Sequence, residues 1–412
     1  LNLLGFSWFL IAVHVAFALL FILYLCFRYF LGVYRSLGHK VMLKHLGIRF
    51  FSPILLVVMV YNGILLSNNW ENFDYHWDDT IENNTGMAHN YYGKDHKHRG
   101  MTVFGWNDDN DEAIAELIKN NIEWVAVVPF MFQKNNKTKQ VDVPEMADAW
   151  TGRDSSFLNS IVQLHAKNIK VMLKPHLWMN EGWRSNIVMD SPAEWATWFA
   201  SYRANMLRYA RMAEKANVEL LCVGTELKSS MRHAPEQWIL LVQEIKTLYK
   251  GQLTYAANWD GEFDYVPFWE QMDYIGIQAY FPLTKKSDPD LELIKTGWDR
   301  HLVTLEQLSA KYDKPILFTE IGYRSDAYTT IKPWEWDGFM SRFKKRTSNK
   351  TQYLAFEALF QKLWHKEWFA GTYIWQWNNH SEPDNSFERL DFSPRHKPAL
   401  NNMAKWYGKP VR

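Results

Sequence analysis

From Arg99 onward the chain repeats one pattern, in which a short apolar run is followed by a longer stretch with helical spacing. Alternation of this kind predicts βα units and a parallel sheet. There are eight such runs, and eight is the number of strands that closes a (β/α)8 barrel. The predicted strands are residues 101–106, 124–130, 170–176, 219–226, 253–258, 274–280, 315–321 and 371–377.

An open, doubly wound sheet would show the same alternation. That fold carries a glycine-rich phosphate loop after its first strand, whereas residues 105–111 here read GWNDDND and are acidic. The barrel is therefore favoured. One helix is predicted over 192–216, with Ser191 as N-cap and Pro192 at its first position, and another over 298–311. A helix is also expected in the fifth connection, 259–272, which is short and aromatic.

Two apolar runs precede the barrel pattern. Residues 6–27 carry no formal charge beyond that of His14 and are long enough to span a bilayer, so a transmembrane helix is predicted. The second run, 50–66, contains Pro53 and Asn62, and we interpret it as a second span, with a signal-like or interfacial segment as the alternative. Residues 1–67 are thus expected to form a membrane anchor.

The loop between the two runs is basic. It contains no Asp or Glu, and the positive-inside rule places such a loop in the cytoplasm. Both ends of the anchor then face outward, and the part of the chain that follows is expected in the periplasm or outside the cell. Residues 68–98 are polar and predict a linker before a barrel domain over 99–412. The basic residues of the loop are Arg28, Arg35, Lys40, Lys44 and Arg49.

Composition narrows the class of ligand. A formal net charge of +1 provides no global field that would gather nucleic acid, so nucleic-acid binding is disfavoured. Aromatic residues make up 16% of the chain, with 21 Trp, and sugar rings pack on such flat side chains. Core packing and membrane-interface anchoring account for most of these Trp residues. Cys26 and Cys222 lie in distant segments and indicate neither a disulfide framework nor a metal site.

Barrels of this kind build their active sites at the carboxyl ends of the strands. The polar and aromatic residues that end the predicted strands are therefore the candidate site residues. They are Trp106, Lys174, His176, Glu226, Asn258, Trp259, Gln278, Tyr280, Glu320, Trp375 and Asn378.

Two of these candidates are carboxylates that end the fourth and seventh strands. Glu226 and Glu320 should face each other across the barrel mouth, as a retaining glycosidase requires, where the two carboxyl groups lie about 5–5.5 Å apart. Either residue alone is more often a helix cap or a salt-bridge partner. Both lie at apolar strand ends, however, where burial of an unpaired carboxylate costs on the order of several kcal/mol. Each therefore needs polar partners. No metal or cofactor is expected.

The other strand-end residues supply these partners. Lys174, His176 and Asn258 can hold the nucleophile ionised through hydrogen bonds, and burial of Glu226 would raise its pKa toward a general-acid role. A structural ion pair is the alternative for Lys174 and His176. We expect Tyr280 to donate to the nucleophile and Trp375 to form the floor of a sugar subsite, with simple packing as the alternative for both.

Several motifs carry a resemblance to known enzymes. GTE at 224–226, TEIGY at 319–323 and WQWN at 375–378 resemble the clan of retaining barrel glycosidases with Glu on strands 4 and 7. GWN at 105–107, LKPH at 173–176, GTEL at 224–227 and YFPL at 280–283 resemble glycoside hydrolase family 113, whose known members act on β-1,4-mannan.

This resemblance covers roughly residues 99–407 and implies an oligo- or polysaccharide substrate. By position, it makes Glu226 the acid/base and Glu320 the nucleophile of a double displacement. One departure is Thr225, where many clan members have Asn to hold the sugar 2-hydroxyl. The alternatives are another β-glycan hydrolase or a transglycosylase on the same barrel, or an inactive membrane-anchored carbohydrate-binding protein.

Overall fold

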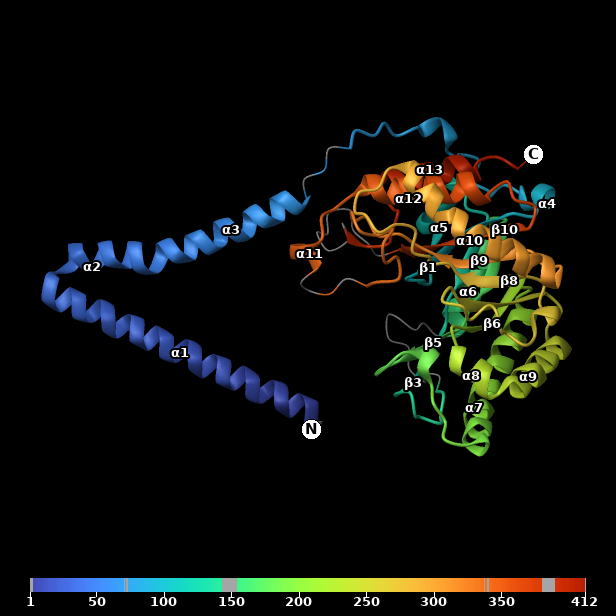
Figure 1. Cartoon of the computed structure of the whole chain (residues 1–412), viewed down its shortest axis with the longest axis horizontal. Coiled ribbons are helices and arrows are strands. Elements are labelled where there is room, and N and C mark those ends of the chain that lie inside the picture. The colour runs from blue at the N-terminus through green and yellow to red at the C-terminus, as the bar shows by residue number, and fades with distance from the viewer. Residues whose placement is uncertain are drawn as a thin grey trace. The chain divides into compact units, whose positions relative to one another are not determined.

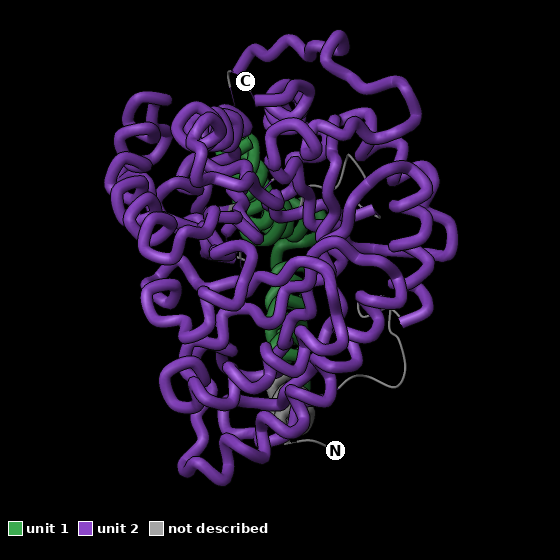
Figure 2. Tube along the Cα trace, turned by 90° about the vertical axis from the view of Figure 1, so that its right-hand side faces the viewer, with its two compact units in different colours: residues 1–69 green, residues 70–412 purple. Residues whose placement is uncertain are grey.

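The computed structural model describes residues 3–69, 71, 73–142, 154–336, 338, 341–379 and 390–411, with the backbone alone for 3–12 and 342. The chain divides into two compact units, residues 1–69 and 70–412, which Figure 2 shows in different colours. The first unit holds the two apolar runs and the second holds the strand-helix repeats.

The first unit is helical. It consists of α1 (Leu3–Leu37), α2 (His39–Leu46), the π-helical segment η1 (Gly47–Phe51) and α3 (Ser52–Asn69). Two stretches, Val13–Leu37 and His39–Asn69, are long and apolar enough to cross a membrane, with mean hydropathies of 2.1 and 2.0 and none of either window buried. Such helices serve either as a membrane anchor or as a signal sequence.

The second unit contains a closed parallel barrel, which confirms the predicted fold (Figure 1). The strands follow one another around the barrel in the order β1-β10-β9-β8-β7-β6-β4-β2. They are β1 (His98–Phe104), β2 (Trp124–Val127), β4 (Lys170–Leu173), β6 (Leu220–Thr225), β7 (Gln252–Asn258), β8 (Ile275–Gln278), β9 (Ile316–Ile321) and β10 (Phe369–Asn378).

The second and third predicted strands are each split in two. Their continuations, β3 (Phe130–Gln133) and β5 (His176–Met179), form a separate two-stranded parallel sheet. The breaks fall at Pro129 and Pro175, which have no N–H to give to a barrel ladder. The third strand therefore leaves the barrel at Lys174 and enters the small sheet at His176.

Helices surround the strands (Figure 1). Helix α7 begins at Pro192, and the Ser191 side chain caps it by accepting from the Glu194 N–H, as predicted. Helix α10 begins at Leu291, earlier than predicted, because Asp290 caps it. The expected helix over 259–272 is wrong: among the described residues that connection holds only η4 (Trp269–Gln271). Other helices are α4 (Tyr92–Asp95), α5 (Asp111–Lys119), α6 (Asp154–Ala166), α8 (Lys228–His233), α9 (Pro235–Leu248), α11 (Ser341–Lys344), α12 (Asn349–Leu363) and α13 (Pro398–Tyr407), with short 3-10 segments η2 (Asp79–Ile81) and η3 (Arg184–Asn186).

Side chains alternate along the barrel strands. In β2, Trp124 and Ala126 belong to a cluster drawn almost entirely from strand residues, whereas Val125 and Val127 pack in the larger cluster that includes the helices. Successive side chains of a strand point to opposite faces, so the first cluster fills the barrel and the second joins barrel to helices. Both layers are buried and hold the strand ends in place.

Residues 71 and 73–98, which belong to the predicted linker, contact the barrel. Tyr75 donates to the Asn401 side chain at 2.6 Å, and Glu71 accepts from the Asn349 backbone N–H at 2.9 Å. The backbone N–H groups of Tyr91 and Tyr92 donate to the buried carboxylate of Glu123, at 2.8 and 3.0 Å. Glu123 immediately precedes β2, so this segment covers the amino ends of the strands.

Candidate active site

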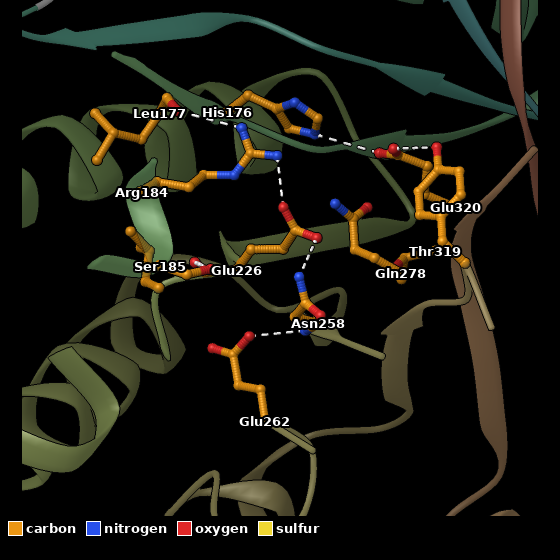
Figure 3. Close-up of polar contacts among 12 residues, drawn as sticks. His176, Leu177, Arg184, Ser185, Glu226, Asn258, Glu262, Gln278, Thr319 and Glu320 are labelled. Atoms are coloured by element: carbon orange, nitrogen blue, oxygen red, sulfur yellow. Dashed lines mark hydrogen bonds and ion pairs between the residues drawn. The ribbon is translucent and has the colours of Figure 1, made fainter. Parts of the chain in front are cut away.

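The barrel brings most of the predicted site residues together at the carboxyl ends of its strands. Glu226 follows β6 and Glu320 lies in β9, and both are buried, at 4% and 5% exposure. Lys174 follows β4, Asn258 ends β7, and Gln278 ends β8. Figure 3 shows Glu226 between Arg184 and Asn258, and Glu320 beside His176.

Each oxygen of the Glu226 carboxylate has a partner. Arg184 Nη2 donates to Oε2 at 2.8 Å, and Asn258 Nδ2 donates to Oε1 at 2.8 Å (Figure 3). Burial raises the pKa of Glu226 and the nearby charge of Glu320 raises it too, whereas Arg184 and Lys174 lower it. The net effect is a raised pKa, which favours a carboxyl group that holds a proton at the pH of reaction.

The backbone of Glu226 adopts a left-handed conformation, with φ of +53°. This region is uncommon for residues other than glycine and persists where surrounding contacts hold it. The Glu226 N–H donates to the Ala256 carbonyl at 2.9 Å, and its carbonyl accepts from Ser185 Oγ at 2.8 Å. Because β6 ends at Thr225, this turn sets the direction in which the Glu226 side chain leaves the strand.

Glu320 is held by a different set of donors. Lys174 Nζ donates to Oε2 at 2.8 Å and Tyr280 Oη donates to Oε1 at 2.6 Å. Lys174 is fully buried and donates also to Gln278 Oε1 at 2.7 Å and to the Thr319 carbonyl at 3.0 Å. Burial raises the pKa of Tyr280 well above its usual range, so the phenol stays a donor. Lys174 and Tyr280 thus both donate to Glu320, as predicted, and Lys174 also forms the ion pair that was the alternative interpretation of this residue.

His176 is close to Glu320 but does not form an ion pair with it. Its Nε2 lies 3.9 Å from Glu320 Oε2, yet burial and the neighbouring Lys174 and Arg184 charges hold the pKa of His176 well below its usual range. The imidazole is therefore neutral. Its ring stacks on Trp375 with centroids 6.1 Å apart and planes 9° apart, and Nε2 has no hydrogen-bond partner within the described chain.

Aromatic side chains lie beside the two carboxylates. Tyr280, Trp375 and Phe392 form a small cluster against which Trp259 packs. Trp334 stacks on Trp259 with ring centroids 4.8 Å apart. Trp336, 60% exposed, meets Trp375 edge to face. These rings offer flat surfaces at the mouth of the barrel.

Asn378 ends β10, as predicted, whereas Trp106 lies two residues beyond the end of β1. Trp106 Nε1 donates to the Val103 carbonyl at 3.1 Å, and the ring packs on the outer core. Asn378 pairs in register with Phe104, and its carbonyl accepts from Arg395 at 3.2 Å. A role for either side chain in substrate binding stays a prediction.

Three polar residues of this network were not predicted from the sequence. Arg184 and Ser185 lie in the η3 segment after β5, and Glu262 lies in the loop after β7. Glu262 is fully buried beneath Asn258. A loop without periodicity gives little basis for placing its side chains, and the one sequence signal was Arg184 directly after Trp183.

Comparison with known proteins places the chain in a family. The model of Glycoside Hydrolase Family 113 matches residues 101–396. The chain belongs to this family. It is a glycoside hydrolase, which confirms the resemblance seen in its motifs.

Solved structures agree with this placement. A GH113 β-1,4-mannanase is 26% identical with a TM-score of 0.65, and the match covers 76% of this chain and 99% of that one. The GH113 β-mannanase of Alicyclobacillus acidocaldarius, in complex with ManMIm, is 25% identical with a TM-score of 0.66 over 76% of this chain and 97% of that one. No curated protein sequence matches the chain.

Proposed function

We propose that this family 113 enzyme is a retaining glycosidase that cleaves β-1,4-linked mannan or manno-oligosaccharides by double displacement. The observation that carries the proposal is the pair of buried carboxyl groups in unlike surroundings. Glu320 accepts from a lysine ammonium and a tyrosine hydroxyl, which favours an ionised nucleophile, whereas the raised pKa of Glu226 suits an acid.

The two steps follow from these environments. Glu320 Oε attacks the anomeric carbon while Glu226 gives its proton to the departing glycosidic oxygen, which leaves a covalent glycosyl-enzyme. Glu226, now ionised, takes a proton from water as that water attacks the same carbon and releases Glu320. Lys174 and Tyr280 hold the nucleophile in place, and Arg184 and Asn258 orient the acid/base.

The mannan preference is supported by the two solved family 113 structures described above, which are both β-mannanases. His176 is neutral, and its Nε2 lies beside the nucleophile without a hydrogen-bond partner in the described chain, so it can bind a sugar hydroxyl. This group can serve in a chain that has Thr225 where many clan members have Asn. The test is turnover of mannotetraose beside matched gluco- and xylo-oligosaccharides. Preference for mannotetraose supports the proposal, elongated products indicate a transglycosylase, and binding without turnover indicates a carbohydrate-binding protein.

Arg184 provides a test of the acid role. Glu226 must be protonated for the first step, so kcat/KM should fall as the pH rises and Glu226 ionises. Because the pKa of Glu226 is raised, this fall should occur at a pH above the usual pKa range of a glutamate. Replacing Arg184 by Met removes a charge that lowers the pKa of Glu226, so the basic limb should move to higher pH. The exposed Arg203, paired with Glu244, gives the control Arg203→Met, which should leave the limb unmoved. A limb that stays in place in Arg184→Met would contradict the assignment.

We further propose that the two apolar helices anchor the enzyme in a membrane, with the basic α2 region in the cytoplasm and the barrel outside it. The five Lys and Arg residues between the two apolar runs support this orientation, because cytoplasmic loops carry an excess of these residues. The chain is expected to remain with membranes after a high-salt or carbonate wash, whereas residues 70–412 alone should be soluble and active. A full chain that is released by the wash, or trimmed after α1, would contradict anchoring and favour a signal sequence.

A further inference from the structure

Glu262 is a buried carboxyl group that is not needed for the two chemical steps. It lies in the loop between β7 and η4, and it is 0% exposed. A carboxyl group is almost never fully buried unless its oxygens are paired. The hydrogen-bond partners of Glu262 therefore indicate its role.

Both oxygens of Glu262 accept hydrogen bonds. Tyr255 Oη donates to Oε1 at 2.6 Å, and the Asn258 backbone N–H donates to Oε2 at 2.7 Å. Both donors come from β7, which pairs with β6, the strand that Glu226 follows. The carboxylate thus joins the end of β7 to the loop that follows it.

Each of these two partners also contacts the Glu226 region. Asn258 Nδ2 donates to Glu226 Oε1 at 2.8 Å, and Tyr255 Oη accepts from the Leu227 backbone N–H at 2.7 Å. Glu262 therefore closes a ring of hydrogen bonds that runs through Asn258 to the Glu226 side chain and through Tyr255 to the peptide that follows Glu226. Figure 3 shows the first half of this ring, from Glu262 through Asn258 to Glu226.

The Glu226 region has a particular need for such support. Its left-handed φ of +53° is held only by its surroundings, and the Leu227 amide belongs to the same turn. The orientation of an acid/base must also match the glycosidic oxygen closely, because small displacements of catalytic groups cost much rate.

We propose that Glu262 is a positioning residue for the acid/base, which fixes the Glu226 carboxyl through Asn258 and the Glu226 backbone through Tyr255. The inference rests on the proposed function, because it takes Glu226 as the group that protonates the departing oxygen. Glu262 acts through these two neighbours and does not touch the substrate.

The titratable groups around Glu262 come from several elements. Glu226 follows β6, Lys228 belongs to α8, Tyr255 lies in β7, and Tyr265 lies in the same loop as Glu262. Burial, and to a lesser extent Glu226, raises the pKa of Glu262 to about 7, against the lowering effects of Tyr255, the Asn258 N–H and Lys228. The ionised form accepts from both donors. Protonation, or replacement by an amide, puts a hydrogen where one donor now points.

The test uses the full chain with Glu262→Gln and two substrates, mannotetraose and dinitrophenyl β-mannobioside. The second has a leaving group that departs without protonation, so its kcat/KM does not depend on a well-placed acid. In Glu262→Gln we expect kcat/KM for mannotetraose to fall about 10- to 100-fold, with a change below about threefold for the dinitrophenyl substrate. Tyr255→Phe is the second variant, for use if Glu262→Gln folds poorly. It removes only the hydroxyl link and should show the same difference between the two substrates to a smaller degree.

Glu123→Gln is the matched control, because Glu123 is also a buried carboxylate that accepts two hydrogen bonds, at the opposite end of the barrel. It should leave the ratio of the two kcat/KM values unchanged. A wild-type chain that turns over neither substrate would refute the proposed function, and a crystal structure of Glu262→Gln would then decide the inference by whether Asn258 and Glu226 separate. Equal losses on both substrates in Glu262→Gln and Tyr255→Phe, or an unmoved Glu226, would overturn the positioning role.

Discussion

Replacing Glu320 by Ala should lower turnover of mannotetraose about 10⁵-fold, within the range that loss of a catalytic nucleophile costs. The variant removes the only group that can form the glycosyl-enzyme in the proposed mechanism. Azide, which is small enough to enter the vacated space, should restore cleavage of dinitrophenyl β-mannobioside. Because azide would attack from the side that Glu320 occupied, the product should be the α-glycosyl azide, identified by NMR.

The variant also leaves the buried Lys174 without its anion, and a broken buried pair typically costs about 3–5 kcal/mol of stability. Thermal unfolding therefore accompanies the kinetics, and Glu320→Gln, which keeps an acceptor for Lys174, separates lost chemistry from lost folding. Glu123→Ala is the control for removing a buried carboxyl group elsewhere. A folded Glu320→Ala variant that retains hydrolysis without azide would show that another residue is the nucleophile.

Replacing Glu226 by Gln should give the second largest effect, a loss of about 10²–10⁴-fold in kcat/KM for mannotetraose. The amide keeps the shape of the side chain and one acceptor oxygen, so it can accept from Arg184 or from Asn258. It has no acidic proton to give to the leaving group. Cleavage of dinitrophenyl β-mannobioside should still begin, with a burst of dinitrophenol followed by slow turnover, since the second step lacks its base. The burst is measured by stopped-flow absorbance.

Glu226→Ala with azide completes this test. Azide should attack the glycosyl-enzyme on the face that Glu226 serves and yield the β-glycosyl azide, the opposite anomer to that from Glu320→Ala. The same anomer from both variants would mean that the two roles are assigned wrongly. An undiminished steady-state rate of Glu226→Gln on mannotetraose would remove Glu226 from the chemistry altogether.

The barrel could be predicted from the sequence because burial on both faces makes each parallel strand an apolar run. The strand ends then indicated Lys174, Asn258, Gln278 and Tyr280, and the structure places the first three and the Tyr280 hydroxyl in contact with a carboxylate or its lysine partner. Periodicity did not reveal that Pro129 and Pro175 would divide two strands. The two prolines were predicted to lie within continuous strands, although proline has no N–H for the hydrogen bonds of a central strand.

Other contacts depend on loops, for which side-chain spacing has no fixed period. Arg184 reaches Glu226 from the segment after β5, and Glu262 reaches Asn258 by a backbone hydrogen bond. His176 was predicted as a possible partner of an ion pair, but its protonation state is set by burial and by two neighbouring cations, which only the folded chain brings together. The contacts of residues 71 and 73–98 with the barrel were not predicted, because the polar composition of this segment is typical of a linker.

The most direct test of the account is the configuration of the first product. Proton NMR of mannotetraose hydrolysis by residues 70–412, recorded within the first minutes, distinguishes the anomers before mutarotation mixes them. A double displacement through Glu320 predicts that the new reducing end appears first as the β anomer and that the α anomer grows in later. First appearance of the α anomer would show a single displacement and contradict the assignment of Glu320 as the nucleophile.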